Sequence, residues 1–144
     1  MSDYRFKKVA VLGAGVMGAQ IAAHLANAGV PVVLFDLPSD GPDKNAIVGK
    51  ALLNLAKLSP APLALKSLAQ QITPANYDEH LPLLSECDLI IEAIAERLDW
   101  KKSLYAKILP FVSSTTVLAS NTSGLSINAL SEVLDASLHH RFCG

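Results

Sequence analysis

Short apolar runs alternate with helical patterns along the chain. The apolar runs have the length of strands, and we predict strands over Lys7–Leu12, Pro31–Phe35, Gln71–Thr73, Cys87–Ile94 and Thr115–Ser120, with a further strand beginning at Arg141–Gly144. Apolar residues at helical spacing predict helices over Ala19–Ala28, Asp43–Leu58, Leu63–Gln70, Leu81–Glu86, Leu98–Leu109 and Ser126–Leu134. Strands that alternate with helices indicate βαβ units and a parallel sheet.

Glycine and proline mark where these elements end. Gly29 follows the first predicted helix, at the position where glycine commonly closes a helix. Ser59–Pro62 interrupts the helical pattern between Asp43 and Gln70, because proline lacks an amide hydrogen and clashes with the preceding turn. The two helical pieces form an insertion after the second strand.

Composition and charge narrow the class of protein. The chain has 144 residues, of which 51% are hydrophobic and 17% charged, which favours one folded domain over disorder. No apolar run approaches the roughly 20 residues of a membrane span, so we expect no membrane span. The net charge of -1 gives no basic patch of the kind that binds nucleic acid, so we expect no nucleic-acid partner.

The cysteines and the N-terminal residues indicate the cellular compartment in which we expect the protein. Cys87 and Cys143 form neither a CxxC pair nor a metal-ligand pattern, so we expect reduced thiols and no metal. The N-terminal residues lack the apolar stretch of a secretory signal. We expect a cytoplasmic protein, or one whose targeting segment is absent from this sequence.

Gly13–Gly18 matches the pattern GxGxxG, with a predicted strand before it and a predicted helix after it. In this context Gly13 allows a tight turn, Gly15 lets a pyrophosphate approach the backbone, and Gly18 lets the helix pack close to the strand. The phosphates would lie at the helix N-terminus, where unpaired amides and the helix dipole favour negative charge. The alternative is that these glycines only make a tight turn.

Asp36 ends the second strand, about 20 residues after the glycines, where an acidic residue hydrogen-bonds the adenosine ribose. Its carboxylate would repel the additional phosphate of NADP, so we favour NAD. FAD uses the same fingerprint and is a competing occupant, and Asp36 could instead cap a loop. These features predict a Rossmann-type, doubly wound, mainly parallel sheet with a helical insertion after the second strand.

Two later segments carry a family resemblance. Glu92–Lys101 and Ala119–Leu125, together with Gly13–Gly18 and Asp36, resemble the NAD-binding domain of 3-hydroxyacyl-CoA dehydrogenases, and the resemblance covers the whole chain. The prolines around Pro60–Leu63 and Ile72–Pro74 look most like the branch at the front of long bacterial enzymes of fatty-acid β-oxidation. The resemblance implies an enzyme that oxidises (3S)-hydroxyacyl-CoA with NAD.

The resemblance also implies roles for particular residues. Glu96 and Lys101 look like the family's pair near the nicotinamide ribose, although an ordinary surface ion pair is the alternative. Ser123 looks like the serine that touches both the cofactor and the substrate's 3-oxygen, and Asn121 helps to shape the same turn; a turn or N-cap serine is the alternative. We therefore predict Ser123 and Asn121 as catalytic. The predicted cofactor-binding residues are Gly13, Gly15, Val16, Met17, Gly18, Asp36, Glu96, Lys101 and Ser123.

Oxidation of an alcohol also needs a base for its proton. In the family this base is a histidine just past the segment that Arg141–Gly144 resembles, where this sequence stops. The four histidines, His24, His80, His139 and His140, are poorly placed to replace it. We expect residues 1–144 to be the NAD-binding domain of a longer enzyme, lacking its helical C-terminal domain and inactive alone.

We expect the longer enzyme to bind an acyl-CoA substrate. In residues 1–144 alone, the surface exposed by the missing domain would allow a homodimer to form. The alternative from another functional class is a stand-alone dinucleotide-binding or redox-sensing module, which uses the same fold without catalysis. A further alternative is another hydride-transfer family, of the short-chain hydroxyacid type.

Overall fold

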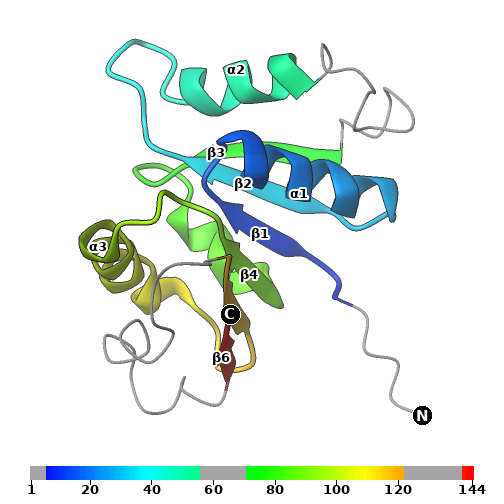
Figure 1. Ribbon diagram of the computed structural model, residues 1–144, viewed down its shortest axis with the longest axis vertical. Coiled ribbons are helices and arrows are strands. Elements are labelled where there is room, and N and C mark those ends of the chain that lie inside the picture. The colour runs from blue at the N-terminus through cyan, green and yellow to red at the C-terminus, as the bar shows by residue number, and fades with distance from the viewer. Residues whose placement is uncertain (1–5, 56–70, 122–140) are drawn as a thin grey trace.

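A computed structural model of the protein describes residues 6–55, 71–121 and 141–144 (Figure 1). Several predictions lie outside these described residues: the end of the insertion, the helix Leu63–Gln70, Ser123, the helix Ser126–Leu134, His139 and His140. No helix in the described ranges has the length and apolarity to cross a membrane.

The described strands form one sheet with the order β3-β2-β1-β4-β5-β6, and every neighbouring pair is parallel. Their bounds are Val9–Leu12 (β1), Val32–Asp36 (β2), Ile72–Asn76 (β3), Leu89–Glu92 (β4), Val117–Ser120 (β5) and Phe142–Cys143 (β6). All four residues of β1 are fully buried, as expected for the central strand of a sheet covered on both faces. Strand β3 lies at an edge, and its Pro74 is in register with Leu34 of β2. The predicted doubly wound parallel fold is confirmed.

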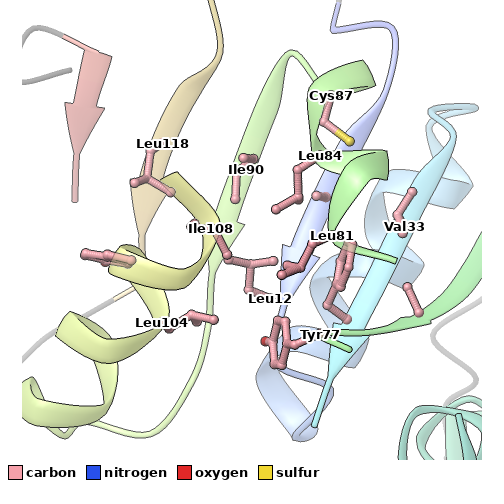
Figure 2. Close-up of a cluster of buried hydrophobic side chains, with 14 residues drawn as sticks. Leu12, Val33, Tyr77, Leu81, Leu84, Cys87, Ile90, Leu104, Ile108 and Leu118 are labelled. Atoms are coloured by element: carbon pink, nitrogen blue, oxygen red, sulfur yellow. The ribbon is translucent and has the colours of Figure 1, made fainter. Parts of the chain in front are cut away.

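Helices cover both faces of this sheet (Figure 1). On one face lie α1 (Val16–Asn27) and α2 (Ala46–Leu55), of which Ala22, Ala26 and Val48 cluster with alternate residues of β1 and β2. On the other lie α3 (Leu98–Ile108) and two 3-10 helices, η2 (Leu81–Glu86) and η3 (Leu109–Phe111). Figure 2 shows the core of this second face, where Leu81 and Leu84 of η2 and Leu104 and Ile108 of α3 pack over the sheet.

Most element boundaries differ from the predictions by one to three residues, including the start of α2, which lies at Ala46 rather than Asp43. Helix α1 starts at Val16 rather than Ala19, because Gly15 already acts as its extended N-cap. Strand β4 covers only Leu89–Glu92 rather than Cys87–Ile94, since Cys87 caps η2 and the chain after Glu92 turns away to line a cleft. Strand β3 runs on to Asn76, beyond the predicted Gln71–Thr73. The predicted stop at Gly29 is confirmed: its φ is 80°, and its amide donates to the Ala26 carbonyl at 2.9 Å.

The two cysteines are free, and they differ in environment. Cys143 is exposed, whereas Cys87 is buried, and that burial raises the pKa of the Cys87 thiol to about 11. Because the thiolate is the form that reacts, iodoacetamide at about pH 8 should alkylate Cys143 well before Cys87. Peptide mass mapping over time checks this order, with urea-unfolded protein as the control in which both react. Equal rates in the folded protein would contradict the burial of Cys87.

Candidate functional site

A cleft of about 490 Å³ opens at the carboxyl ends of β1 and β4, where the strand order changes direction. Ligands of open parallel sheets bind at this point. The strands and the segments that follow them supply one part of the lining, and one face of α3 supplies the other. The lining residues are Gly13, Gly15, Asp36, Leu37, Tyr77, Ala93, Ile94, Ala95, Trp100, Ser103, Leu104 and Lys107.

Gly13 and Gly18 allow parts of the backbone to approach each other closely. The φ of Gly13 is 108°, and a Cβ placed there would lie 2.8 Å from the Ala93 carbonyl oxygen. A Cβ at Gly18 would lie only 1.7 Å from the carbonyl oxygen of Gly13. These two glycines are therefore required by the protein's own packing, as the fingerprint predicts for the turn and for helix–strand contact.

Gly15 is different, because none of the described residues has an atom within 4 Å of a Cβ built there. Its backbone angles, φ -68° and ψ -172°, are open to any residue. Gly15 lines the cleft and forms the N-cap of α1, where no side chain caps the helix and no acidic residue occupies the first turn. The first amides of α1, including those of Val16 and Met17, thus have no intrahelical partner. This is a cradle for an anion that a side chain at Gly15 would fill.

Asp36 ties the end of β2 to the glycine turn. Its Oδ2 accepts the amide of Ala14 at 2.8 Å, and its Oδ1 accepts the amide of Leu37 at 2.6 Å. The role of a loop cap, which the sequence left open, is therefore present. Each carboxylate oxygen can accept a second hydrogen bond, and Asp36 lines the cleft. The carboxylate is consequently held in place with acceptor capacity left for the hydroxyls of a ribose.

A buried polar network lies beside the cleft, with Glu92 at its centre. Its Oε1 accepts the hydroxyls of Tyr105 and Ser120, each at 2.7 Å. Its Oε2 accepts the amide of Ile94 at 3.0 Å and lies 3.0 Å from Nζ of Lys101. The Glu92 and Lys101 side chains are both fully buried. Glu92 therefore joins β4, β5 and α3 at their cleft ends.

Lys101 is the residue whose surroundings differ most from expectation. The alternative of an ordinary surface ion pair with Glu96 is wrong for Lys101, because its side chain is 0% exposed. Its ammonium is nearer to Glu92 than to Glu96, whose Oε1 is 3.9 Å away and whose side chain is 43% exposed. Sequence reasoning missed Glu92, and the available signal was a carboxylate within an otherwise apolar strand.

The turn after β5 is attached to the same network. The amide of Asn121 donates to the backbone carbonyl of Glu92 at 2.7 Å, and Asn121 is exposed. Ser123 lies beyond the described residues. Asn121 and Lys101 thus both contact Glu92, Asn121 through the Glu92 backbone and Lys101 through the Glu92 side chain.

Tyr77 brings a buried hydroxyl group to the cleft lining. Its side chain is 4% exposed and stacks on Phe35, with ring centroids 5.7 Å apart. Within the described ranges its hydroxyl has no hydrogen-bond partner. Burial, and then the negative charges of Asp36 and Glu92, raise the pKa of Tyr77, so the phenol stays protonated. A protonated phenol without an acceptor favours a polar ligand over an apolar one in this cleft.

The described histidines lie outside the cleft lining. His24 is exposed on α1, and Nδ1 of His80 accepts the amide of Asn76 at 3.0 Å, a structural role. The described ranges also contain no group of three His, Cys, Asp or Glu residues able to hold a metal ion.

Comparison with known proteins identifies the family. The family described as 3-hydroxyacyl-CoA dehydrogenase, NAD binding domain, matches residues 8–144. Over 137 residues the chain is 44% identical to the "Putative fatty acid oxidation complex trifunctional enzyme" of Rickettsia felis, covering 94% of this chain and 19% of that protein. Over 141 residues it is 39% identical to the "Probable 3-hydroxyacyl-CoA dehydrogenase" of Deinococcus radiodurans, covering 97% of this chain and 41% of that protein. The chain thus spans about a fifth of the length of the first relative and about two fifths of the second.

A solved structure agrees with the sequence matches. The crystal structure of 3-hydroxybutyryl-CoA dehydrogenase from Escherichia coli superposes with a TM-score of 0.75 at 28% identity, covering 96% of this chain and 29% of that one. The family resemblance and the NAD cofactor predicted from the sequence are confirmed. The chain belongs to the 3-hydroxyacyl-CoA dehydrogenase family and corresponds to its NAD-binding domain.

Proposed function

We propose that residues 1–144 form one NAD-binding domain of a protein that oxidises (3S)-3-hydroxyacyl-CoA to 3-oxoacyl-CoA in fatty-acid β-oxidation. The observation that carries this proposal is the Asp36 carboxylate, fixed at the glycine turn by the Ala14 and Leu37 amides and lining the cleft. A fixed carboxylate at this place suits the two ribose hydroxyls of an adenosine.

Different residues at the cleft would bind different parts of the dinucleotide. Gly15 leaves space for the pyrophosphate, which the first amides of α1, at Val16, Met17 and Gly18, would bind. Asp36 would hold the adenosine ribose. When bound, NAD supplies the hydride acceptor.

At the other end of the dinucleotide, Glu96 would contact the nicotinamide ribose, and Lys101 would hold Glu96 in place from its buried position 3.9 Å away. Asn121 would shape the turn from which Ser123 meets the 3-oxygen of the substrate, donating to a carbonyl or accepting from an alcohol. None of the described histidines lines the cleft, so we assign this domain the cofactor site and place the proton-accepting base outside its described residues.

Coenzyme preference tests the proposal. Calorimetric titration should show NADH binding at least about 10-fold more tightly than NADPH, equivalent to ~1.4 kcal/mol, because the fixed Asp36 charge repels the 2′-phosphate. Asp36→Asn should narrow this ratio in two ways: NADH weakens because its ribose loses a charged acceptor, and NADPH strengthens because its 2′-phosphate is no longer repelled. Asp40→Asn makes the same change of charge at an exposed position outside the cleft lining and should leave both affinities unchanged. Failure of the wild-type chain to bind NADH would contradict the proposed function.

A further inference from the structure

The Glu92 carboxylate uses all of its acceptor capacity inside the protein. A carboxylate offers roughly four acceptor positions. Glu92 faces four donors, which are the hydroxyls of Tyr105 and Ser120 at Oε1 and the Ile94 amide and Lys101 ammonium at Oε2. Its side chain is fully buried. Glu92 therefore has one fixed orientation, and its carboxylate is closed off from a ligand in the cleft.

The charges of Glu92 and Lys101 are not what holds the fold together. Replacing a buried ion pair with apolar residues of similar volume is often neutral or stabilising, because taking two charges out of water is unfavourable. Both side chains are nevertheless 0% exposed. They meet where β4 ends and the chain continues into the cleft lining at Ala93, Ile94 and Ala95. An ion pair kept in this position indicates a role in binding rather than in folding.

Lys101 connects the buried carboxylate to an accessible one. The Lys101 ammonium lies 3.0 Å from Oε2 of Glu92 and donates to Oγ of Ser120 at 3.4 Å. On its other side, Oε1 of Glu96 is 3.9 Å away, on a side chain that is 43% exposed. An ammonium has three donors, so two can be held inside the protein while the third points to Glu96. Without the Glu92 carboxylate the ammonium would shift, and Glu96 would lose a fixed positive charge beside it.

We infer that Glu92 is a positioning residue for the nicotinamide end of the cofactor. Its carboxylate fixes the Lys101 ammonium, and Lys101 in turn holds Glu96, the residue proposed to contact the nicotinamide ribose. Its backbone carbonyl also holds the chain after β5, by accepting the amide of Asn121 at 2.7 Å. This inference rests on the proposed function, because it requires NAD to bind with its nicotinamide ribose beside Glu96.

Calorimetric titration with NADH and with ADP locates the effect within the cofactor. ADP carries the adenosine and two phosphates but neither the second ribose nor the nicotinamide. Glu92→Gln should weaken NADH by about 10-fold, the order expected when a hydrogen bond to a charged group is lost. It should leave ADP unchanged, because the four donors around Glu92 are distinct from Asp36 and from the glycine turn. The control, Glu86→Gln, makes the same change of charge on an exposed carboxylate outside the cleft lining and should alter neither affinity.

A double-mutant cycle separates positioning from loosening of the fold. Glu92→Gln combined with Lys101→Met leaves neither buried charge unpaired, so this double variant should unfold at a higher urea concentration than Glu92→Gln. If Glu92 acts through Lys101, the two single variants and the double variant should all bind NADH ~10-fold more weakly than the wild type. Independent contributions would instead add, giving a loss of roughly 100-fold in the double variant.

Circular dichroism of each variant checks the fold, and the double variant supplies the NADH and ADP comparison if Glu92→Gln alone does not fold. Wild-type NADH affinity in the double variant, equal weakening of NADH and ADP, or an additive loss would each overturn the positioning role while leaving the proposed function in place. Absence of NADH binding by the wild-type chain would overturn both.

Discussion

Replacing Gly18 by alanine should destabilise the fold by about 3 kcal/mol or more, whereas the same replacement at Gly15 should leave stability unchanged and remove most of the affinity for NADH. At Gly18 the new Cβ would lie 1.7 Å from a backbone carbonyl oxygen that cannot move without opening the turn. The higher helix propensity of alanine offsets only about 1 kcal/mol of this cost. At Gly15 the new methyl group meets no atom of the described part of the chain within 4 Å and occupies the space proposed for the pyrophosphate.

Urea unfolding and NADH calorimetry on the two variants separate these effects. We expect Gly15→Ala to unfold at the wild-type urea concentration and to bind NADH at least ~10-fold more weakly, a loss of about 1.4 kcal/mol. Gly49→Ala is a matched control for NADH affinity, because Gly49 lies in α2, outside the cleft lining, and a Cβ built there has no atom of residues 6–55, 71–121 or 141–144 within 4 Å. Wild-type NADH affinity in Gly15→Ala would show that the phosphates lie elsewhere.

Glu92→Gln should lower the free energy of unfolding by about 3–5 kcal/mol, because it leaves the Lys101 ammonium buried without its nearest carboxylate. The amide also replaces one acceptor oxygen with a donor, and because each oxygen faces two donors, two of the four donors around Glu92 lose their acceptor. Removing both charges, in Glu92→Gln with Lys101→Met, should cost less than Glu92→Gln alone, since no buried charge then remains unpaired.

The exposed pair Lys8–Glu86 provides the control for this prediction. Its Nζ–Oε2 distance is 2.7 Å, shorter than the Lys101–Glu92 distance of 3.0 Å, but its side chains are 31% and 58% exposed. Solvent screening limits such a pair to at most about 1 kcal/mol, so Glu86→Gln should change the urea midpoint little. Equal destabilisation by Glu86→Gln and Glu92→Gln would mean that burial does not determine how much the Glu92 network contributes to the free energy of unfolding.

The sequence was sufficient for the sheet and for the glycine turn, because both leave local patterns. Apolar runs of strand length, separated by helical spacing, predicted the strands around β1 and β2, and Gly13–Gly18 followed by Asp36 predicted the cleft at their ends. These features depend on residues that are close together in the sequence. The type of each residue is therefore enough to predict how it packs.

The network around Glu92 could not be predicted in the same way, because its members come from three elements. Whether Lys101 meets solvent or a carboxylate depends on how α3 lies over β4 and β5. The family resemblance implied only that Glu96 and Lys101 are a pair near the nicotinamide ribose. The ends of β4 were misplaced for a related reason: Ala93 and Ile94 are apolar like the strand residues, yet they line the cleft. Hydrophobicity alone does not separate a strand from the cleft-lining segment that follows it.

Pro74 in β3 has a consequence for how the molecule behaves at high concentration. An edge strand displays unpaired backbone groups with which a second chain can pair, and this pairing is a route to aggregation. Proline has no amide hydrogen, so β3 presents a gap in its row of donors at Pro74. The edge formed by β3 is thereby protected against the addition of a foreign strand, and Pro74→Ala would remove that protection.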